Sequence, residues 1–182
     1  MKLKSWIIAN KDFFKNWILP LILAFIISIL IKEFLLFVAY IPTSSMYPTL
    51  IPGDRLLITR IYDKKSIHRG DILVFHSHER DENMVKRVIG LPYDEIEILD
   101  NSVYINGELY PEKYLEESQK DSIEQEKYSG TFMVPEGKYF FLGDNRSNSL
   151  DSRDWKDKYI AFKDIKGKAR FIIFPFSRFK FF

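Results

Sequence analysis

Cysteine is absent from the 182-residue sequence, which excludes disulfides, a thiolate nucleophile and a thiolate metal site. Histidine is scarce, with three residues. Two of them, His76 and His78, fall in a charged loop that is typical of a solvated hairpin tip rather than a metal site. The formal net charge is only +2, so no basic stripe indicates nucleic-acid binding. Any nucleophile must be an oxygen, or a lysine or histidine nitrogen, and we expect no cofactor, no metal and no nucleic-acid partner.

Long apolar sequence, by contrast, is present near the N-terminus. From Trp17 to Ile31 nearly every residue is apolar, and after a Lys-Glu pair the run resumes as far as Ile41. As a helix, residues 17–41 would cover roughly 37 Å, enough to cross a hydrocarbon core of ~30 Å. We therefore predict a membrane anchor over residues 17–40. The Lys-Glu pair would reach the outer interface, and the following domain would sit on the membrane lipid.

The charges before this run predict its orientation. Four lysines precede it against a single acid, Asp12, and the positive-inside rule then keeps residues 1–16 in the cytoplasm. Residues 41–182 would form an extracytoplasmic domain, held at the cell membrane by a single pass. A cleaved secretory signal also has a basic start and an apolar middle. Against that alternative, the run is long, and bulky Phe37 lies where a cleavage site at Ala39 would need a small residue.

After the anchor, short apolar and β-branched runs alternate with turn sequences, which is the spacing of strands and turns. The clearest turn is Asn106-Gly107, which supplies both positive-φ positions of a type I′ hairpin. The sequence therefore predicts a mostly antiparallel β domain. The expected strands are Arg55–Ile61, Asp71–His76, Met84–Ile89, Glu95–Leu99, Val103–Ile105, Thr131–Val134, Lys138–Leu142 and Lys168–Phe174.

Two segments depart from this pattern. Residues 112–127 are acidic and poor in apolar side chains, which indicates a solvated excursion, and we interpret residues from about 100 to 136 as a small inserted subdomain. The C-terminus is aromatic instead. A buried last strand accounts for the chain up to Phe174. The phenylalanines beyond it, interleaved with Arg178 and Lys180, suit either a membrane interface or a tail that covers the core.

The first polar stretch that could carry chemistry is residues 41–50. It holds three hydroxyls between Pro42 and Pro48, and the two prolines would keep it extended and present a serine rather than bury it. The alternative is a Ser/Thr-rich linker behind an anchor.

The second stretch, residues 84–90, is a strand in which Met84, Lys86 and Val88 share one face. A lysine in such a strand usually faces solvent. If Lys86 is instead buried beside apolar atoms, its pKa falls from near 10.4, and a base at neutral pH requires a shift of roughly 3 units. Because a serine hydroxyl needs a base to take its proton, and the histidines lie near turns, a Ser-Lys dyad is the simplest hypothesis.

The third stretch, residues 143–155, is dense in Asp, Asn, Ser and Arg. It is either an exposed loop or a loop locked by its own hydrogen bonds and Arg-Asp pairs, and a locked loop can fix a site.

Taken in order, these three stretches, with Gly-Asp-Ile-Leu-Val-Phe at residues 70–75 between them, closely resemble the sequence boxes of bacterial type I signal peptidases in their short, Gram-positive-like form. The resemblance covers most of the chain. It implies a membrane-bound serine endopeptidase of the Ser-Lys class that removes signal peptides from exported preproteins, cutting after small residues through an acyl-enzyme. It also implies a mostly β fold shared with the self-cleaving repressor proteases.

Residue by residue, the resemblance implies that Ser45 is the nucleophile and Lys86 the general base and acid. Thr43 falls at the position of a hydroxyl donor to the oxyanion, and Ser149 at that of a serine that orients the lysine. The remaining matches are structural or supporting positions near the site: Arg87, Asp144, Arg146, Asp151 and Arg153. For the substrate, we expect strand addition to the backbone at Ile41, Met84 and Val85.

The sequence departs from the family pattern at a few positions. Thr43-Ser44 stands where the family has Ser-Gly, which makes Ser44 a rival nucleophile by sequence alone. Tyr93 stands where Gly-Leu-Pro is usually followed by glycine, and Lys156 follows Trp155 where glycine is frequent.

Other function classes stay open at this point. A related regulatory or self-cleaving Ser-Lys protease is usually soluble and carries a DNA-binding module, whereas this chain begins with an apolar span. A non-enzymatic anchored β domain would have no reason to bring Ser45, Lys86 and Ser149 together. An inactive sibling is disfavoured because a workable residue occupies every catalytic position of the family.

Overall fold

The computed structural model describes residues 11, 13–99, 102–115 and 129–182. The chain divides into two compact units, one ending at Phe37 and the other running from Val38 to Phe182.

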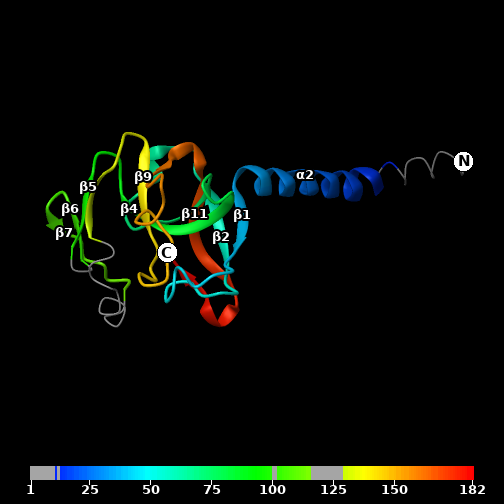
Figure 1. Ribbon diagram of the computed structural model, residues 1–182. Coiled ribbons are helices and arrows are strands. Elements are labelled where there is room, and N and C mark those ends of the chain that lie inside the picture. Colours follow the sequence, from blue (N-terminus) through cyan, green and yellow to red (C-terminus); the bar gives the residue numbers. More distant parts are fainter. Residues whose placement is uncertain (1–10, 12, 100–101, 116–128) are drawn as a thin grey trace, which may run out of the picture. The chain divides into compact units, whose positions relative to one another are not determined.

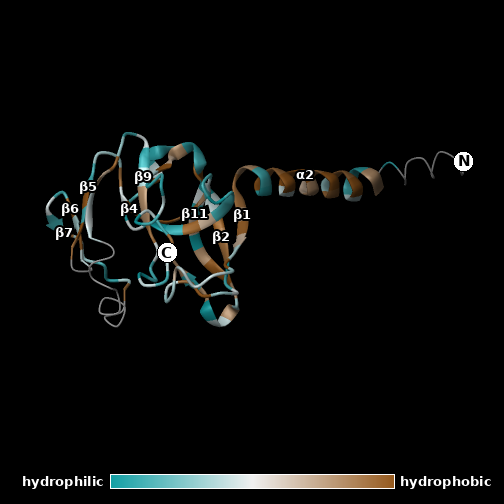
Figure 2. Ribbon diagram, viewed as in Figure 1, coloured by the Kyte–Doolittle hydropathy of each residue, from teal (hydrophilic) through white to brown (hydrophobic). Residues whose placement is uncertain are grey.

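The N-terminal unit is helical. The helices η1 (Phe14–Ile18) and α2 (Leu19–Phe34) follow one another, and no residue in α2 is buried. Phe14–Phe34 is 21 residues long with a mean hydropathy of 2.2, which corresponds to about 32 Å of helix, and α2 is predominantly apolar in Figure 2. By length and composition this helix can cross a membrane, although a cleaved signal sequence near the N-terminus passes the same test.

The helix ends earlier than the sequence predicts. It stops at Phe34, and Leu36–Tyr40 form strand β1 rather than a continuation of the helix. The reason lies in local composition and in an available partner: the strand holds phenylalanine, valine and tyrosine, which favour extended backbone, and it pairs with β2 of the main sheet. The limits of a membrane anchor at residues 17–40 stay a prediction.

The second unit is built on a main sheet with the strand order β1-β2-β11-β3-β4-β9-β10, to which β12 adds by pairing with β11 (Figure 1). The strand β11, which comes late in the chain, thus lies between β2 and β3. From β2 through β10, and between β11 and β12, neighbouring strands pair antiparallel. The strands are β1 (Leu36–Tyr40), β2 (Arg55–Arg60), β3 (Ile72–Ser77), β4 (Glu82–Gly90), β9 (Lys138–Leu142), β10 (Ile160–Ala161), β11 (Ile165–Phe174) and β12 (Lys180–Phe181).

A smaller antiparallel sheet has the order β7-β6-β5-β8. Its strands are β5 (Glu95–Leu99), β6 (Ser102–Ile105), β7 (Glu108–Leu109) and β8 (Gly130–Met133). The smaller sheet therefore begins at Glu95, before the start near residue 100 that we expected for the inserted subdomain, because β5 pairs with β6 and β8 and not with the main sheet. Short 3₁₀ helices complete the fold: η2 (Lys64–Ser66), η3 (Phe162–Asp164) and η4 (Phe176–Arg178).

The strand β9 is buried on both faces and separates two apolar cores. Tyr139 and Phe141 contribute to the core that contains Leu73, Phe75 and Trp155. Their neighbours in the sequence, Phe140 and Leu142, contribute to the core under the smaller sheet, with Ile89, Ile96, Ile98, Val103, Ile105 and Val134. The period of two along a strand produces this division, and β4 divides in the same way. A strand buried on both faces is a rigid support for side chains at its end.

The structure confirms the mostly antiparallel β domain and the turn at Asn106-Gly107, where φ is 53° and 82°. The predicted excursion lies mainly outside the described residues, because the structure does not describe residues 116–128. The phenylalanines after the last long strand do not cover the core: Phe176 and Phe181 are 81% and 68% exposed. A membrane interface at this surface stays a prediction.

Tyr93, the departure from the family's glycine, has a φ of 73°, a region that costs a non-glycine residue roughly 1–2 kcal/mol. Its side chain is 68% exposed. We expect Tyr93→Gly to raise the free energy of unfolding by about 0.5–1 kcal/mol. The greater freedom of glycine in the unfolded chain offsets the remainder of the relieved strain. The thermal midpoint of the detergent-solubilised protein should rise by about 2–4 °C.

Asn106→Gly is the matched control. Asn106 also has positive φ, but its side chain accepts from the Glu95 amide at 2.9 Å and donates to Asp94 at 3.0 Å. Removing these bonds should offset the relief of strain, so this variant should not be more stable. A drop in the midpoint of Tyr93→Gly would contradict the strain argument.

Candidate active site

A groove of about 460 Å³ lies in the second unit, and the predicted catalytic stretches meet there. Residues 40–46 line one side, and residues 82–86 of β4 line another. The polar loop after β9 contributes Ser149. Ser45, Lys86 and Ser149 therefore line the same groove, and their catalytic roles stay a prediction.

The segment that presents Ser45 is a turn and not the extended stretch that the two prolines suggested. The Tyr47 amide donates to the Ser44 carbonyl at 3.0 Å, and the Leu50 amide to the Met46 carbonyl at 2.9 Å. Met46 and Leu50 are 1% and 0% exposed. Their burial anchors the turn in the core, which outweighs the extended preference of residues that precede proline and leaves the neighbouring serine at the groove.

The Ser45 hydroxyl lies 3.5 Å from the Thr43 hydroxyl, a long contact. The backbone amide of Ser45 has no hydrogen-bond acceptor in the part of the chain that the structure describes. An unbonded N–H and a neighbouring hydroxyl at the edge of a groove are donors that a developing oxyanion could use.

Lys86 is buried, and the solvent-facing alternative is wrong. It is 2% exposed. On the same face of β4, Val88 belongs to the apolar core and Met84 packs against that core. Its Nζ donates to the Ser149 hydroxyl at 2.9 Å. Burial lowers the pKa of Lys86 to about 8, against the opposing effect of the negative charge on Asp151.

Ser45 and Lys86 both line the groove, yet within the described residues no direct hydrogen bond joins Ser45 Oγ to Lys86 Nζ. Each side chain instead bonds a neighbouring hydroxyl. In an enzyme without substrate, catalytic hydrogen bonds are often long and shorten only in the complex.

The loop that carries Ser149 is locked by its own contacts. Asp151 is 0% exposed and accepts from the Gly143 amide at 2.9 Å and from Arg153 Nε at 2.8 Å. Burial alone would raise the pKa of Asp151, but the Arg153 charge and these hydrogen bonds lower it below its usual value. A Cβ on Gly143 would lie 2.1 Å from Ser149 Oγ and 2.5 Å from the Ser45 carbonyl, so only glycine permits this approach.

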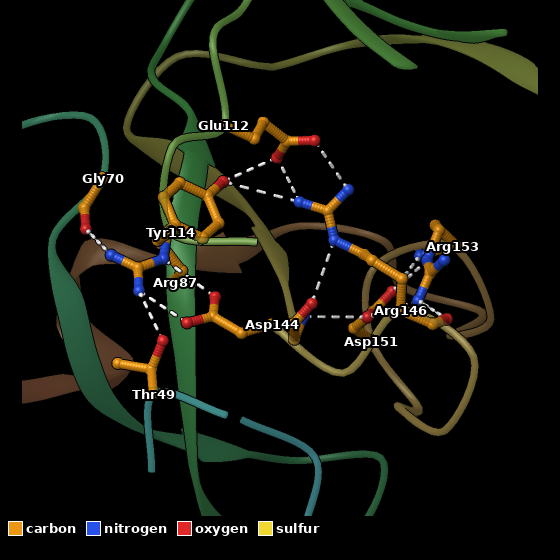
Figure 3. Close-up of polar contacts among 10 residues, drawn as sticks. Thr49, Gly70, Arg87, Glu112, Tyr114, Asp144, Arg146, Asp151 and Arg153 are labelled. Carbon is orange, nitrogen blue, oxygen red and sulfur yellow. Dashed lines mark hydrogen bonds and ion pairs between the residues drawn. The ribbon is translucent and has the colours of Figure 1, made fainter. Parts of the chain in front are cut away.

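Two further arginine pairs flank the loop (Figure 3). Arg87 donates to Asp144 from Nε and from a terminal nitrogen, at 2.8 and 2.5 Å. Arg146 does not pair with a loop aspartate as the sequence suggested. It forms a buried bidentate ion pair with Glu112, and Glu112 in turn accepts from the Tyr114 hydroxyl at 2.6 Å. The Tyr114 ring lies 3.8 Å from the Arg87 guanidinium carbon, so these contacts connect the segment that follows β7 to the loop.

Sequence reasoning missed three residues of this region. Glu112 is 6% exposed, although it opens an acidic run that looked solvated, and nothing local distinguishes it from its neighbours. Tyr114 was not singled out. Asn145, in the loop, contacts the serine turn through its amide groups. Its position two residues after a glycine in a polar loop was the available indication.

The residues expected to bind substrate also line the groove: Ile41, Met84 and Val85. The pairing of β4 with β9 begins at Arg87. Within the part of the chain that the structure describes, the edge of β4 from Glu82 to Lys86 is therefore unpaired on that side, which is the geometry that strand addition requires.

Among serine hydrolases, a lysine with a lowered pKa can take the place of a histidine base, and the groove holds the residue types of that class. Comparison with known proteins gives the family. The chain belongs to the signal peptidase family, peptidase S26, whose profile matches residues 14–174. It is accordingly a peptidase.

Relatives match over nearly the whole chain. Signal peptidase I of Bacillus licheniformis is 37% identical over 173 residues, covering 92% of this chain and 92% of the relative. Signal peptidase IB of Staphylococcus aureus (strain MRSA252) is 36% identical over 180 residues, covering 91% and 92%. A crystal structure of a signal peptidase I from Enterococcus faecalis V583 is similar with a TM-score of 0.49 at 34% identity, covering 58% of this chain and 98% of that chain.

The burial of Lys86 predicts a gain in stability when its charge is removed. With a pKa of about 8 in the folded protein and 10.5 as the ordinary value, the shift corresponds to about 3 kcal/mol at pH 7. Lys86→Met also loses the bond to Ser149, worth about 1 kcal/mol. We expect a net gain of about 2 kcal/mol at pH 7, measured as a higher melting temperature.

The stability difference between Lys86→Met and the wild type should depend on pH. Above a pH of about 8 the folded protein has released the Lys86 proton while the unfolded chain still holds it, so the wild type becomes more stable as pH rises toward 10.5. The advantage of Lys86→Met should shrink over this interval. Lys166→Met, at an exposed position of β11, is the control and should change little. A Lys86→Met variant that is less stable than the wild type at pH 7 would refute the argument.

Proposed function

We propose that Ser45 and Lys86 form the catalytic dyad with which this peptidase removes signal peptides from exported preproteins. The observation that supports the proposal most strongly is the environment of Lys86. The residue is 2% exposed, and its amine bonds a neutral serine hydroxyl in the groove that Ser45 lines. The names of the relatives, signal peptidase I, agree with this reaction.

In the proposed mechanism, neutral Lys86 takes the proton of Ser45 Oγ as that oxygen attacks the carbonyl carbon of the scissile bond. Lys86 then gives the proton to the leaving amine, which departs as the new N-terminus. Neutral Lys86 then takes a proton from water as the water attacks the ester carbonyl, and it returns this proton to Ser45 Oγ as the C–O bond of the ester breaks. Ser149 orients the lysine, because the Nζ–Oγ bond of 2.9 Å fixes where the remaining lone pair and protons point.

The oxyanion of the tetrahedral intermediate would be bound by the Thr43 hydroxyl and the Ser45 amide. The contact of 3.5 Å between Thr43 Oγ1 and Ser45 Oγ places the two hydroxyls at one edge of the groove. Each donor that is preorganised for the transition state contributes about 3 kcal/mol.

The substrate would bind as an added strand along the free edge of β4, with Ile41 on the other side. Met84 and Val85 would form shallow apolar pockets that admit alanine-sized side chains. The arginine pairs with Asp144 and Asp151 would keep the loop in place.

The N-terminal helix would anchor the enzyme in the cell membrane as a single pass. The lysines that precede it favour a cytoplasmic N-terminus and an extracytoplasmic catalytic domain. Membrane lipid would then be a partner of the domain. The domain would lie at the outer face of the membrane, where the cleavage points of exported preproteins emerge.

Replacing the proposed nucleophile tests the assignment. Cleavage of a preprotein by the detergent-solubilised protein should fall by at least about 10³-fold in Ser45→Ala, whereas Ser44→Ala should stay active. Lys86→Arg should also be inactive, because arginine does not lose its proton at neutral pH. An active Ser45→Ala together with an inactive Ser44→Ala would reassign the nucleophile, and an active Lys86→Arg would remove the lysine from the role of base.

The pH profile tests the base. Because the pKa of Lys86 is about 8 and only its neutral form accepts a proton, kcat/KM should rise as the pH increases through this value. About one tenth of the amine is neutral at pH 7 and about nine tenths at pH 9, so the increase should be about tenfold. A profile that is flat from pH 6.5 to 9.5 would argue against lysine as the base.

A further inference from the structure

In the polar loop at residues 143–155, Asn145 bonds the backbone of the turn that presents Ser45 in two places. Its backbone amide donates to the Ser45 carbonyl at 3.0 Å, and its side-chain Nδ2 donates to the Ser44 carbonyl at 3.0 Å. The Ser147 hydroxyl donates to Asn145 Oδ1 at 3.4 Å, which is consistent with the orientation of the side-chain amide. One residue therefore holds two consecutive carbonyl groups, on either side of the Cα of the proposed nucleophile.

The Ser44 carbonyl is part of the same planar peptide as the Ser45 amide. In a trans peptide the C=O and the N–H point in opposite directions, so a bond that fixes the oxygen also fixes the direction of the N–H. The Ser44 carbonyl has a second donor, the Tyr47 amide within the turn. The Ser45 N–H itself has no acceptor among the described residues, and it is the amide that the proposed function uses for the oxyanion.

We propose that Asn145 is a positioning residue for the oxyanion site: its side chain locks the Ser44–Ser45 peptide so that the Ser45 N–H stays directed at the developing oxyanion. The proposal rests on the proposed function. Asn145 does not touch the reacting atoms. It acts by keeping a donor preorganised, and preorganised donors contribute to the transition state and not to ground-state binding.

A neighbouring asparagine separates this role from a general need for contacts with the turn. Asn148 Nδ2 bonds the hydroxyl of Ser44 at 3.2 Å, a side chain that is not part of the peptide plane. Asn148 thus contacts the same residue with the same chemistry, but it does not hold the carbonyl. Asn148→Ala is therefore the matched control.

The test compares Asn145→Leu, which keeps approximate volume but has no donor, Asn145→Ala and Asn148→Ala in the full-length, detergent-solubilised protein with a preprotein substrate. For both Asn145 variants we expect kcat to fall by about 10- to 100-fold, KM to change by less than about threefold, and the pH midpoint of activity to stay at the wild-type value, because the Lys86–Ser149 contact is untouched. Asn148→Ala should stay within about threefold of wild type.

A double-mutant cycle with Thr43→Val adds a readout that a purely structural role would not produce. If Thr43 and the Ser45 amide serve one oxyanion, the losses from Thr43→Val and Asn145→Leu should not be additive. Additive losses, an unchanged kcat in the Asn145 variants, or a loss confined to KM would each overturn the proposal. Loss of the melting transition in both Asn145 variants would assign the residue to folding and overturn it as well.

Failure of this proposal can be told apart from failure of the proposed function. If the wild type cleaves the preprotein and Ser45→Ala does not, the dyad stands whatever the Asn145 variants do. If Ser45→Ala cleaves as the wild type does, the proposed function fails and the role of Asn145 fails with it.

Discussion

The structure depends on keeping one amine out of water without giving it a carboxylate partner. Lys86 is 2% exposed, and its Nζ bonds the neutral Ser149 hydroxyl at 2.9 Å. A carboxylate in that place would hold the proton, since an opposite charge raises the pKa of a lysine. The acids near the amine, Asp144 and Asp151, are each bound by an arginine instead. The ion pairs of the loop thus limit how far those carboxylates stabilise the charged lysine.

The fold supplies the rigidity that this arrangement requires. The second half of β4 is buried on both faces, because Val88 and Ile89 enter different cores. Lys86 is held just before that region, at the point where β4 stops pairing with β9 and its edge becomes free. The same position therefore provides burial for the amine and an open edge for an extended chain. The close contact of Gly143 with Ser149 and Ser45 brings the third stretch to the same place.

Much of this could be predicted from the sequence, because the strands and turns follow local patterns. The runs from Glu95 to Leu99 and from Lys138 to Leu142 match the observed strands. The sequence failed where contacts between distant segments decide the outcome. Burial of Met46 and Leu50 makes a turn of a stretch that two prolines suggested was extended, and Glu112 is buried only because Arg146, far along the chain, pairs with it. The role of Asn145 depends on which carbonyl its side chain meets, and no local pattern encodes that.

Lys86 should lose its proton far more readily than an ordinary lysine, because its amine is buried beside a neutral hydroxyl. The most direct measurement is an NMR titration of the full-length protein in detergent, with lysine side chains isotopically labelled and the Lys86 resonance assigned by its absence in Lys86→Met. We predict a titration midpoint of about 8. A midpoint at or above the ordinary value of 10.5 would mean that the amine is solvated or paired with an acid, and Lys86 could then not serve as a neutral base.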